Sequence, residues 1–200
     1  MMDINTLVEA VAGRLFVELE ASGRHVHVTK EQALTLFGHG LTPKRPLSQP
    51  GQYLSQERVT VRGPKGEFAN VAVLGPERKE GQVEISLTDA RALGIPAPIR
   101  LSGDIDGTPG AELVGPKGKV TLLQGVIAAK RHIHLTPEAA KLFGVENGQR
   151  VRLKTYTNRP IVFEDVAVRV SSQFAPYAHI DYDEANACGF KAGDLGRILP

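Results

Sequence analysis

The sequence lacks several features that would place it in other classes of protein. It has one cysteine, Cys188, and no tryptophan. One cysteine excludes an intrachain disulfide framework and a zinc site built from several thiolates, so a reducing, cytoplasmic environment is expected. No apolar run could span a bilayer, and no basic stretch followed by an apolar core marks a secretory signal. A formal net charge of +2 is too small to predict nucleic-acid binding.

What the chain does contain is glycine, proline and many short strand-like segments. Its 200 residues suffice for one or two domains with real cores. Apolar residues at helical spacing predict a helix over 3–12, which could pack on the body, dock to a partner or serve as a targeting tag; packing is favoured. Residues 38–52 are predicted to form a surface loop. Further short helices are predicted at 29–38, between Thr29 and Gly38, and at 88–93, 137–143 and 183–188. Strands are predicted at 15–22, 57–63, 68–75, 82–87, 111–122 as a hairpin, 125–135, 149–157 and 161–171. Such a pattern favours β-barrels or a β-sandwich.

One segment occurs twice. Residues 24–38 and 131–144 share Arg-His-x-His, then Thr, Glu and Ala at equal offsets, and Leu-Phe-Gly after one gap. An internal duplication that yields two related β-domains is the simplest account.

The duplicated segment carries four of the six histidines. Residues i and i+2 of a strand point to the same face, so His25 and His27 project together, as do His132 and His134. Two neutral imidazoles on a rigid strand form a chelate suited to zinc and similar ions. One such pair is weak evidence, but two copies predict a metal site. The pairs could bind one ion with four nitrogens or recruit further ligands.

Candidates for further ligands lie in two other strands or turns. His179 stands close to Asp181, Asp183 and Glu184 in "YAHIDYDEANACG", and Glu84 interrupts an apolar alternation in "QVEISL". Taken alone, Glu84 would be interpreted as part of a solvated strand face. His39 lacks such a context and is predicted to be a surface residue.

The turn before Glu84 is a candidate anion site. Arg78 and Lys79 stand between two predicted strands, and the planar fork of arginine suits phosphate oxygens; an ordinary charged turn is about equally compatible. No Walker or dinucleotide-binding glycine loop and no Gly-x-Ser-x-Gly elbow occurs in the sequence. Cys188 has no signature of a nucleophile, and a buried or capping role is favoured.

Four motifs, "SGRHVHVT", "VLGPERKEGQVEIS", "AAKRHIHLTPEAAKLFG" and "AHIDYDEANACG", resemble those of the PduL-type phosphotransacylases, the phosphate propanoyltransferase family. The resemblance spans about Gly13 to Ile198. It implies a mainly β fold of two β-barrel domains capped by short helices, with a dinuclear zinc site between them. The implied parts are a helix over 1–13, one barrel from 14–23 plus 130–199, and a second barrel from 24–129.

The resemblance also implies roles for individual residues. One zinc ion would be held by His25, His27 and Glu84. The other would be held by His132, His134 and His179. Arg78 would be the catalytic and phosphate-binding residue, with Ser102 as a further phosphate contact.

The implied reaction is acyl-CoA + phosphate ⇌ acyl phosphate + CoA, for a short acyl group such as propanoyl or acetyl. Phosphate would attack a zinc-polarised thioester directly. No membrane or nucleic-acid partner is expected. The resemblance leaves open whether the N-terminal helix directs the chain into a bacterial microcompartment, such as one for propanediol degradation. It also leaves open whether the chain forms a homo-oligomer. The alternatives are a dinuclear zinc hydrolase and a β-barrel interaction module with a structural metal.

Overall fold

A computed structural model of the chain describes residues 15–199. The helix predicted over 1–13 lies outside the described residues. The chain divides into two compact units: unit 1 comprises Met1–Ser22 with Arg131–Pro200, and unit 2 comprises Gly23–Lys130.

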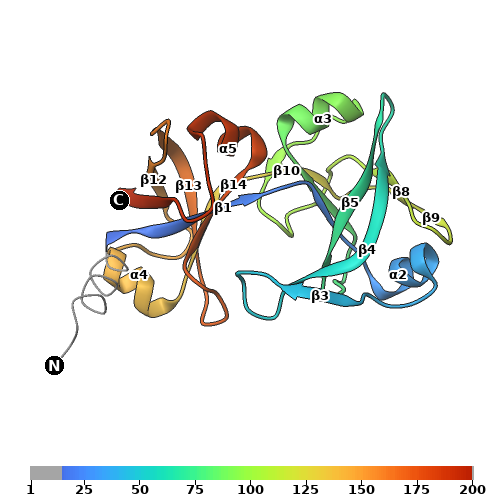
Figure 1. Cartoon of the computed structure of the whole chain (residues 1–200), viewed down its shortest axis with the longest axis horizontal. Helices are drawn as coiled ribbons and strands as arrows, with labels where there is room; N and C mark the ends of the chain where they lie inside the picture. The colour runs from blue at the N-terminus through green and yellow to red at the C-terminus, as the bar shows by residue number, and fades with distance from the viewer. Residues whose placement is uncertain (1–14, 200) are drawn as a thin grey trace. The chain divides into compact units, whose positions relative to one another are not determined.

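Unit 1 is built on a closed six-stranded barrel with the strand order β1-β14-β11-β13-β12-β15 (Figure 1). Exposed and buried residues alternate strictly along β12, so that Val151 and Leu153 point into the core of the barrel. The core also includes Ile133 and Ile180 from the strands that carry the predicted ligands. The strands are β1 (Val17–Ser22), β11 (His132–Leu135), β12 (Arg150–Tyr156), β13 (Val162–Val170), β14 (Tyr177–Asp181) and β15 (Leu195–Leu199).

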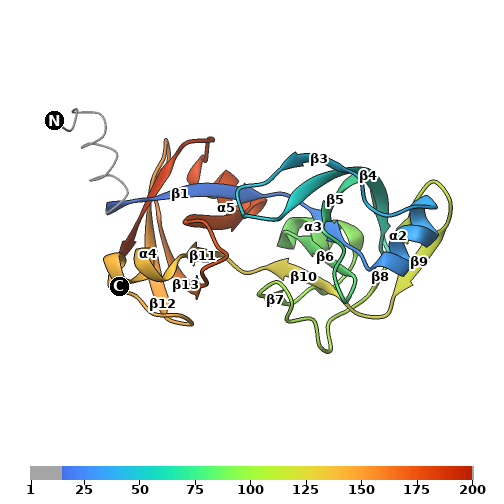
Figure 2. The same cartoon turned by 90° about the horizontal axis from the view of Figure 1, so that it is seen from below.

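Unit 2 is a nine-stranded sheet that curls into a half-barrel around its own core (Figure 2). Eight strands follow the order β7-β10-β6-β2-β5-β4-β8-β9, and β3 pairs with β4. The strands are β2 (His25–His27), β3 (Pro43–Pro46), β4 (Tyr53–Arg62), β5 (Glu67–Gly75), β6 (Gln82–Ile85), β7 (Ile99–Arg100), β8 (Ala111–Val114), β9 (Lys119–Leu122) and β10 (Val126–Ala129).

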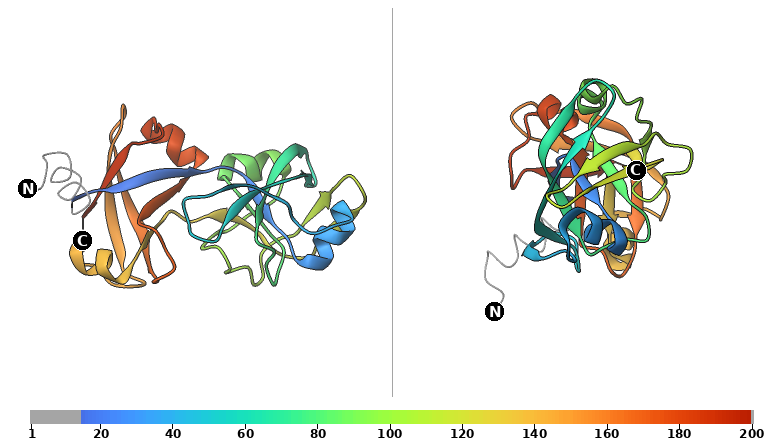
Figure 3. Two further views of the ribbon diagram at one scale, coloured as in Figure 1. Left: turned by 60° about the horizontal axis from the view of Figure 1, so that its bottom comes forward. Right: turned by 90° about the vertical axis from the view of Figure 1, so that its right-hand side faces the viewer.

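Within residues 15–199, four short helices cover the ends of the two units (Figure 3). They are α2 (Lys30–Phe37), α3 (Leu87–Leu93), α4 (Pro137–Phe143) and α5 (Tyr182–Cys188). Each begins after a side-chain N-cap and ends at a glycine in the left-handed conformation. A residue without Cβ adopts that conformation at little cost, which explains why the helices stop there. Thr29 and Gly38 cap α2 as predicted.

The duplication extends well beyond the repeated segment of sequence. β2 is parallel to β5 and antiparallel to β6, while β11 is parallel to β13 and antiparallel to β14. Even a backbone irregularity recurs, because Asn70 and Asp165 both have positive φ, at 58° and 54°. Each stands two residues before the partner of the first histidine, Ala72 opposite His25 and Ala167 opposite His132.

The predicted mainly β fold with barrels capped by short helices is confirmed, although the sheet of unit 2 curls without closing. The single strand predicted over 125–135 is wrong. It is two strands, β10 and β11, because the chain leaves one unit and enters the other between them. The strand β14 was not predicted, and the predicted loop 38–52 contains the exposed strand β3.

Candidate functional site

In unit 2, three side chains converge that the sequence had singled out separately. His25 and His27 project from β2, and Glu84 on β6 lies directly opposite His25 in the antiparallel register. All three are buried, so the solvated face considered for Glu84 is excluded. The Nε2 atoms of both histidines lie 3.6 Å from Oε1 of Glu84. We call these residues the Glu84 cluster.

The spacing of the Glu84 cluster fits a tetrahedral divalent ion. Two ligands about 2.1 Å from zinc at the tetrahedral angle would lie about 3.4 Å apart. The rings are oriented from behind, because Nδ1 of His25 donates to the carbonyl of Gly23 at 2.8 Å and Nδ1 of His27 donates to that of Leu74 at 3.3 Å. Each Nε2 therefore faces Glu84 and can offer its lone pair to a metal ion once it carries no proton, as in many metal sites whose histidines donate through the other nitrogen.

The electrostatics of the Glu84 cluster reflect a buried ion pair. Burial lowers the pKa of His25, but the Glu84 carboxylate more than offsets this and the pKa is raised overall. Burial lowers the pKa of His27 to about 4. Burial raises the pKa of Glu84, yet attraction to His25 and hydrogen bonds to both histidines bring it well below its usual value. His27 is thus neutral at physiological pH, which is the protonation state that binds metal.

In unit 1, His132, His134 and His179 form the equivalent His179 cluster. His132 on β11 lies opposite His179 on β14, just as His25 lies opposite Glu84. The three ligand atoms lie within 4.8 Å of one another. An all-imidazole donor set suits zinc and other borderline ions. The ring of Phe174 stacks on His134 at 4.0 Å between centroids.

Glu20 supports the His179 cluster from β1. Its Oε2 lies 3.3 Å from Nδ1 of His179, and the two residues are paired in the parallel register of β1 and β14. A carboxylate on the distal nitrogen fixes the tautomer of a metal-binding imidazole and raises its basicity. Glu20 could not be predicted from the sequence, because only the strand register brings it to His179.

A polar network connects the Glu84 cluster to the predicted phosphate residues. Nη1 of Arg78 donates to Oγ of Ser102 at 2.9 Å. The amide of Gln82 donates to the same Oγ at 3.0 Å and to Oε1 of Glu84 at 2.6 Å. Its carbonyl oxygen accepts from the backbone N–H of Gly103 at 2.8 Å. The structure thus brings Arg78 and Ser102 together, through Gln82, which the sequence analysis also missed.

Several other residues named from the sequence do not join either cluster. Asp181 caps α5, and Glu184 completes its capping box. Lys79 is exposed, unlike the half-buried Arg78. His39 is exposed as predicted, and its Nδ1 contacts the Gly40 carbonyl. Cys188 is buried as predicted, and burial raises the pKa of its thiol, which keeps it in the unreactive protonated form.

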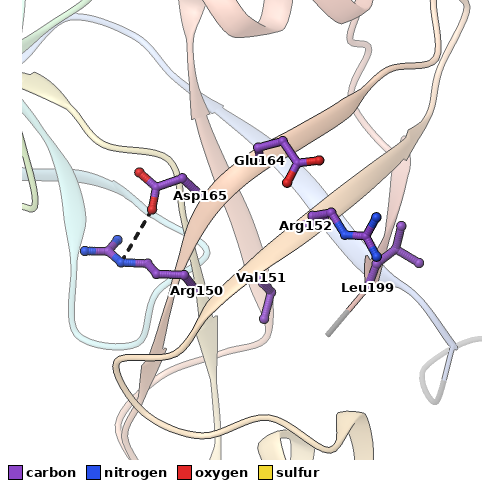
Figure 4. A pocket seen from close by; sticks show the side chains of 6 residues that line it. All are labelled: Arg150, Val151, Arg152, Glu164, Asp165 and Leu199. Carbon is purple, nitrogen blue, oxygen red and sulfur yellow. Dashed lines mark ion pairs between the residues drawn. The ribbon is translucent and has the colours of Figure 1, made fainter.

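A pocket on unit 1 lies apart from these residues (Figure 4). Its charged side chains come from β12 and β13, and Arg150 pairs with Asp165 across it at 3.6 Å. It is lined by Arg150, Val151, Arg152, Glu164, Asp165 and Leu199. None of the predicted ligands or phosphate residues lines it, so it offers no support for the predicted chemistry.

The chain is thus a mainly β protein with two groups of side chains that could hold a metal ion. Beside one of them lies a hydrogen-bonded network that includes Arg78. Within residues 15–199, no helix is long and apolar enough to cross a membrane. A family model described as phosphate propanoyltransferase matches residues 18–191. The chain belongs to this family. It is therefore an enzyme of the phosphate acyltransferase class, as the resemblance predicted.

Individual relatives agree over nearly the whole chain. A phosphate propanoyltransferase of Enterococcus faecalis is 53% identical, with 98% of this chain and 97% of the relative covered. One of Listeria monocytogenes is 54% identical over 98% of this chain and 95% of the relative. One of Thermotoga maritima is 51% identical over 89% of this chain and 86% of the relative.

Proposed function

We propose that this enzyme interconverts acyl-CoA and phosphate with acyl phosphate and coenzyme A, with a short acyl group such as propanoyl or acetyl. The observation that carries the proposal is the continuous network from Arg78 through Ser102 and Gln82 to the Glu84 cluster. It provides a residue suited to phosphate beside residues suited to a metal ion.

Arg78 is assigned the binding of phosphate. Its guanidinium is a planar fork of N–H donors, which suits phosphate oxygens, and its charge can offset that of the nucleophile. Oγ of Ser102 accepts from both Arg78 and Gln82, so its own hydroxyl hydrogen can be donated to a phosphate oxygen. Two donors fixed in this way can hold phosphate in line with a thioester carbonyl carbon.

The Glu84 cluster and the His179 cluster are each assigned one zinc ion. When bound, zinc supplies a Lewis acid that polarises the thioester carbonyl and stabilises a departing thiolate. The chain's own contribution is the neutral imidazoles, with Nδ1 of His25 and His27 held by carbonyl groups and Nδ1 of His179 beside Glu20. The ring nitrogens that would face the metal ion are thereby held in place before it binds.

Direct attack by phosphate is assigned rather than an acyl-enzyme. The phosphate oxygen forms a bond to the carbonyl carbon as the C–S bond breaks, and the electron pair leaves with the sulfur of coenzyme A. The chain's only thiol, Cys188, is buried with a raised pKa and makes a poor nucleophile. Accumulation of an acylated chain in the absence of phosphate would argue for the covalent route instead.

Release of free thiol from a panel of acyl-CoAs, with and without phosphate, tests the proposed reaction. The transferase requires phosphate for thiol release and yields acyl phosphate in equal amount. Release without phosphate would support a zinc hydrolase, and no release would support a structural metal module. The rates for acyl groups that differ by one methylene should differ modestly, since one methylene is worth about 1–3 kcal/mol in a pocket. The sequence leaves open both encapsulation in a microcompartment through residues 1–13 and homo-oligomer formation.

A further inference from the structure

The arginine that precedes each histidine pair makes an ion pair that no motif predicted. In unit 2, Arg24 binds Asp89 side-on, with Nε 3.0 Å from Oδ2 and Nη2 2.7 Å from Oδ1. Asp89 is 5% exposed and lies in the first turn of α3. That helix begins after Ser86, two residues beyond Glu84. The ion pair therefore connects the strand of the histidine pair to the segment that carries the third ligand.

The same arrangement recurs in unit 1. Nη1 of Arg131 lies 2.7 Å from Oε1 of Glu184 in the first turn of α5, and its Nε donates to the carbonyl of Glu164 at 2.7 Å. This helix begins after Asp181, again two residues beyond the third ligand, His179. In both units the acidic partner occupies the third helical position and completes the capping box.

Each arginine is also held by a phenylalanine at an equivalent place. Arg24 lies 4.0 Å from the ring centroid of Phe68, and Arg131 lies 5.7 Å from that of Phe163. Each ring stands four residues before the residue that pairs with the first histidine. Cation–π contact and hydrogen bonds from two of its nitrogens both restrict each guanidinium. The arginine is thus fixed on both sides.

We propose that Arg24–Asp89 and Arg131–Glu184 are two positioning pairs, each of which sets the metal affinity of the cluster in its own unit. Each pair holds the start of the histidine strand against the end of the strand that carries the third ligand. The first histidine and the third ligand face each other at that place in the register. The inference rests on the proposed metal binding by the two clusters. Neither pair touches the reacting groups, so neither arginine is a catalytic residue.

Zinc affinity, measured by competition with a chromophoric chelator, distinguishes positioning from general stabilisation. The full chain with His134→Ala retains only the Glu84 cluster as an intact three-ligand set, and the chain with His27→Ala retains only the His179 cluster. Added to His134→Ala, Arg24→Gln should weaken zinc binding by about 10–100-fold, the usual effect of losing a group that orients ligands. Added to His27→Ala, it should leave zinc affinity unchanged. Arg131→Gln should show the opposite pattern. It should weaken zinc binding when added to His27→Ala and leave zinc affinity unchanged when added to His134→Ala.

Arg62→Gln is the matched control, because Arg62 forms two ion pairs of 2.8 Å on unit 2, with Glu67 and Glu112, that involve no cluster residue. It should change neither affinity. Arg24→Lys keeps the charge without the fork and should restore part of the affinity lost in Arg24→Gln. It also provides the measurement should Arg24→Gln fail to fold.

Three outcomes would overturn the proposal. The first is an equal loss of zinc affinity at both clusters in Arg24→Gln or Arg131→Gln. The second is a lower melting temperature of these variants with unchanged zinc affinities. The third is the absence of zinc binding by the His134→Ala and His27→Ala chains. The last outcome would mean that the two clusters bind zinc only together, as one cooperative centre. Phosphate-dependent thiol release by the unaltered chain would still decide separately whether the acyl transfer takes place.

Discussion

Glu84 occupies a fully buried strand, β6, where a carboxylate is expensive unless it is paired. Its partners are the two histidines, whose Nε2 atoms both lie 3.6 Å away, and the Gln82 amide at 2.6 Å. A proton on Nε2 of His25 and a metal ion would occupy the same place beside Glu84. Metal binding and protonation therefore compete at this cluster.

The competition predicts proton release on zinc binding. Glu84 raises the pKa of His25 despite burial, so His25 holds its proton more readily than His27, whose pKa burial lowers to about 4. In His134→Ala, zinc should displace protons from His25, and its affinity should fall as the pH drops. Titration calorimetry in buffers of different ionisation enthalpy measures the release. Adding Glu84→Gln should reduce it, and an equal release would contradict the assigned pairing.

Arg78 should be needed for turnover and not for metal binding. Arg78→Ala removes the proposed phosphate donor and the 2.9 Å bond to Ser102, and the loss of one fixed donor to a reacting group typically costs about 10²–10³-fold in rate. Steady-state thiol release and zinc content of the same sample provide the two measurements. Arg62→Gln should keep both. Loss of zinc together with turnover would mean that Arg78 supports the Glu84 cluster instead.

The short helices that follow the histidine strands depend on single hydroxyl caps. Thr29 accepts from the backbone N–H of Gln32, whose side chain accepts from Thr29 N–H in return, and Thr136 accepts from Ala139. Thr29→Ala should lower the free energy of unfolding by about 1 kcal/mol, as lost N-caps usually do. Urea unfolding checks this, with Thr29→Ser as the control that keeps the hydroxyl. An unchanged midpoint would show that tertiary contacts alone hold α2.

Local signals in the sequence were sufficient to place each histidine pair on a strand and to predict the helix between Thr29 and Gly38, because capping and two-residue alternation depend on neighbours along the chain. They did not reveal the break between β10 and β11. They did not reveal β14, whose five residues in "YAHID" mix charged, polar and apolar side chains. Nor did they reveal Glu20 or Gln82. These residues meet their partners only through strand pairing, and register cannot be determined from one strand.

Each unit carries a complete set of the same parts: a histidine strand, a capped helix, a proposed third ligand on the opposing antiparallel strand, and an arginine pair beside it. The proposed third ligand differs, Glu84 in unit 2 and His179 in unit 1. A carboxylate adds negative charge that His179 cannot supply, so the two sites should hold their ions with different strength and different dependence on pH. The duplication thus predicts two separable metal sites of unequal chemistry.

Removing one histidine from each unit tests this separation. His27→Ala and His134→Ala should each reduce the zinc content from about two ions per chain to about one, since three protein ligands define each site. Both should lower phosphate-dependent thiol release. Zinc content after dialysis, measured by atomic emission, and turnover of the same sample are compared with His39→Ala, which alters an exposed histidine outside both clusters. Loss of both ions in either variant would show that the two sites form one cooperative centre, and loss of neither would remove that histidine from the ligand set.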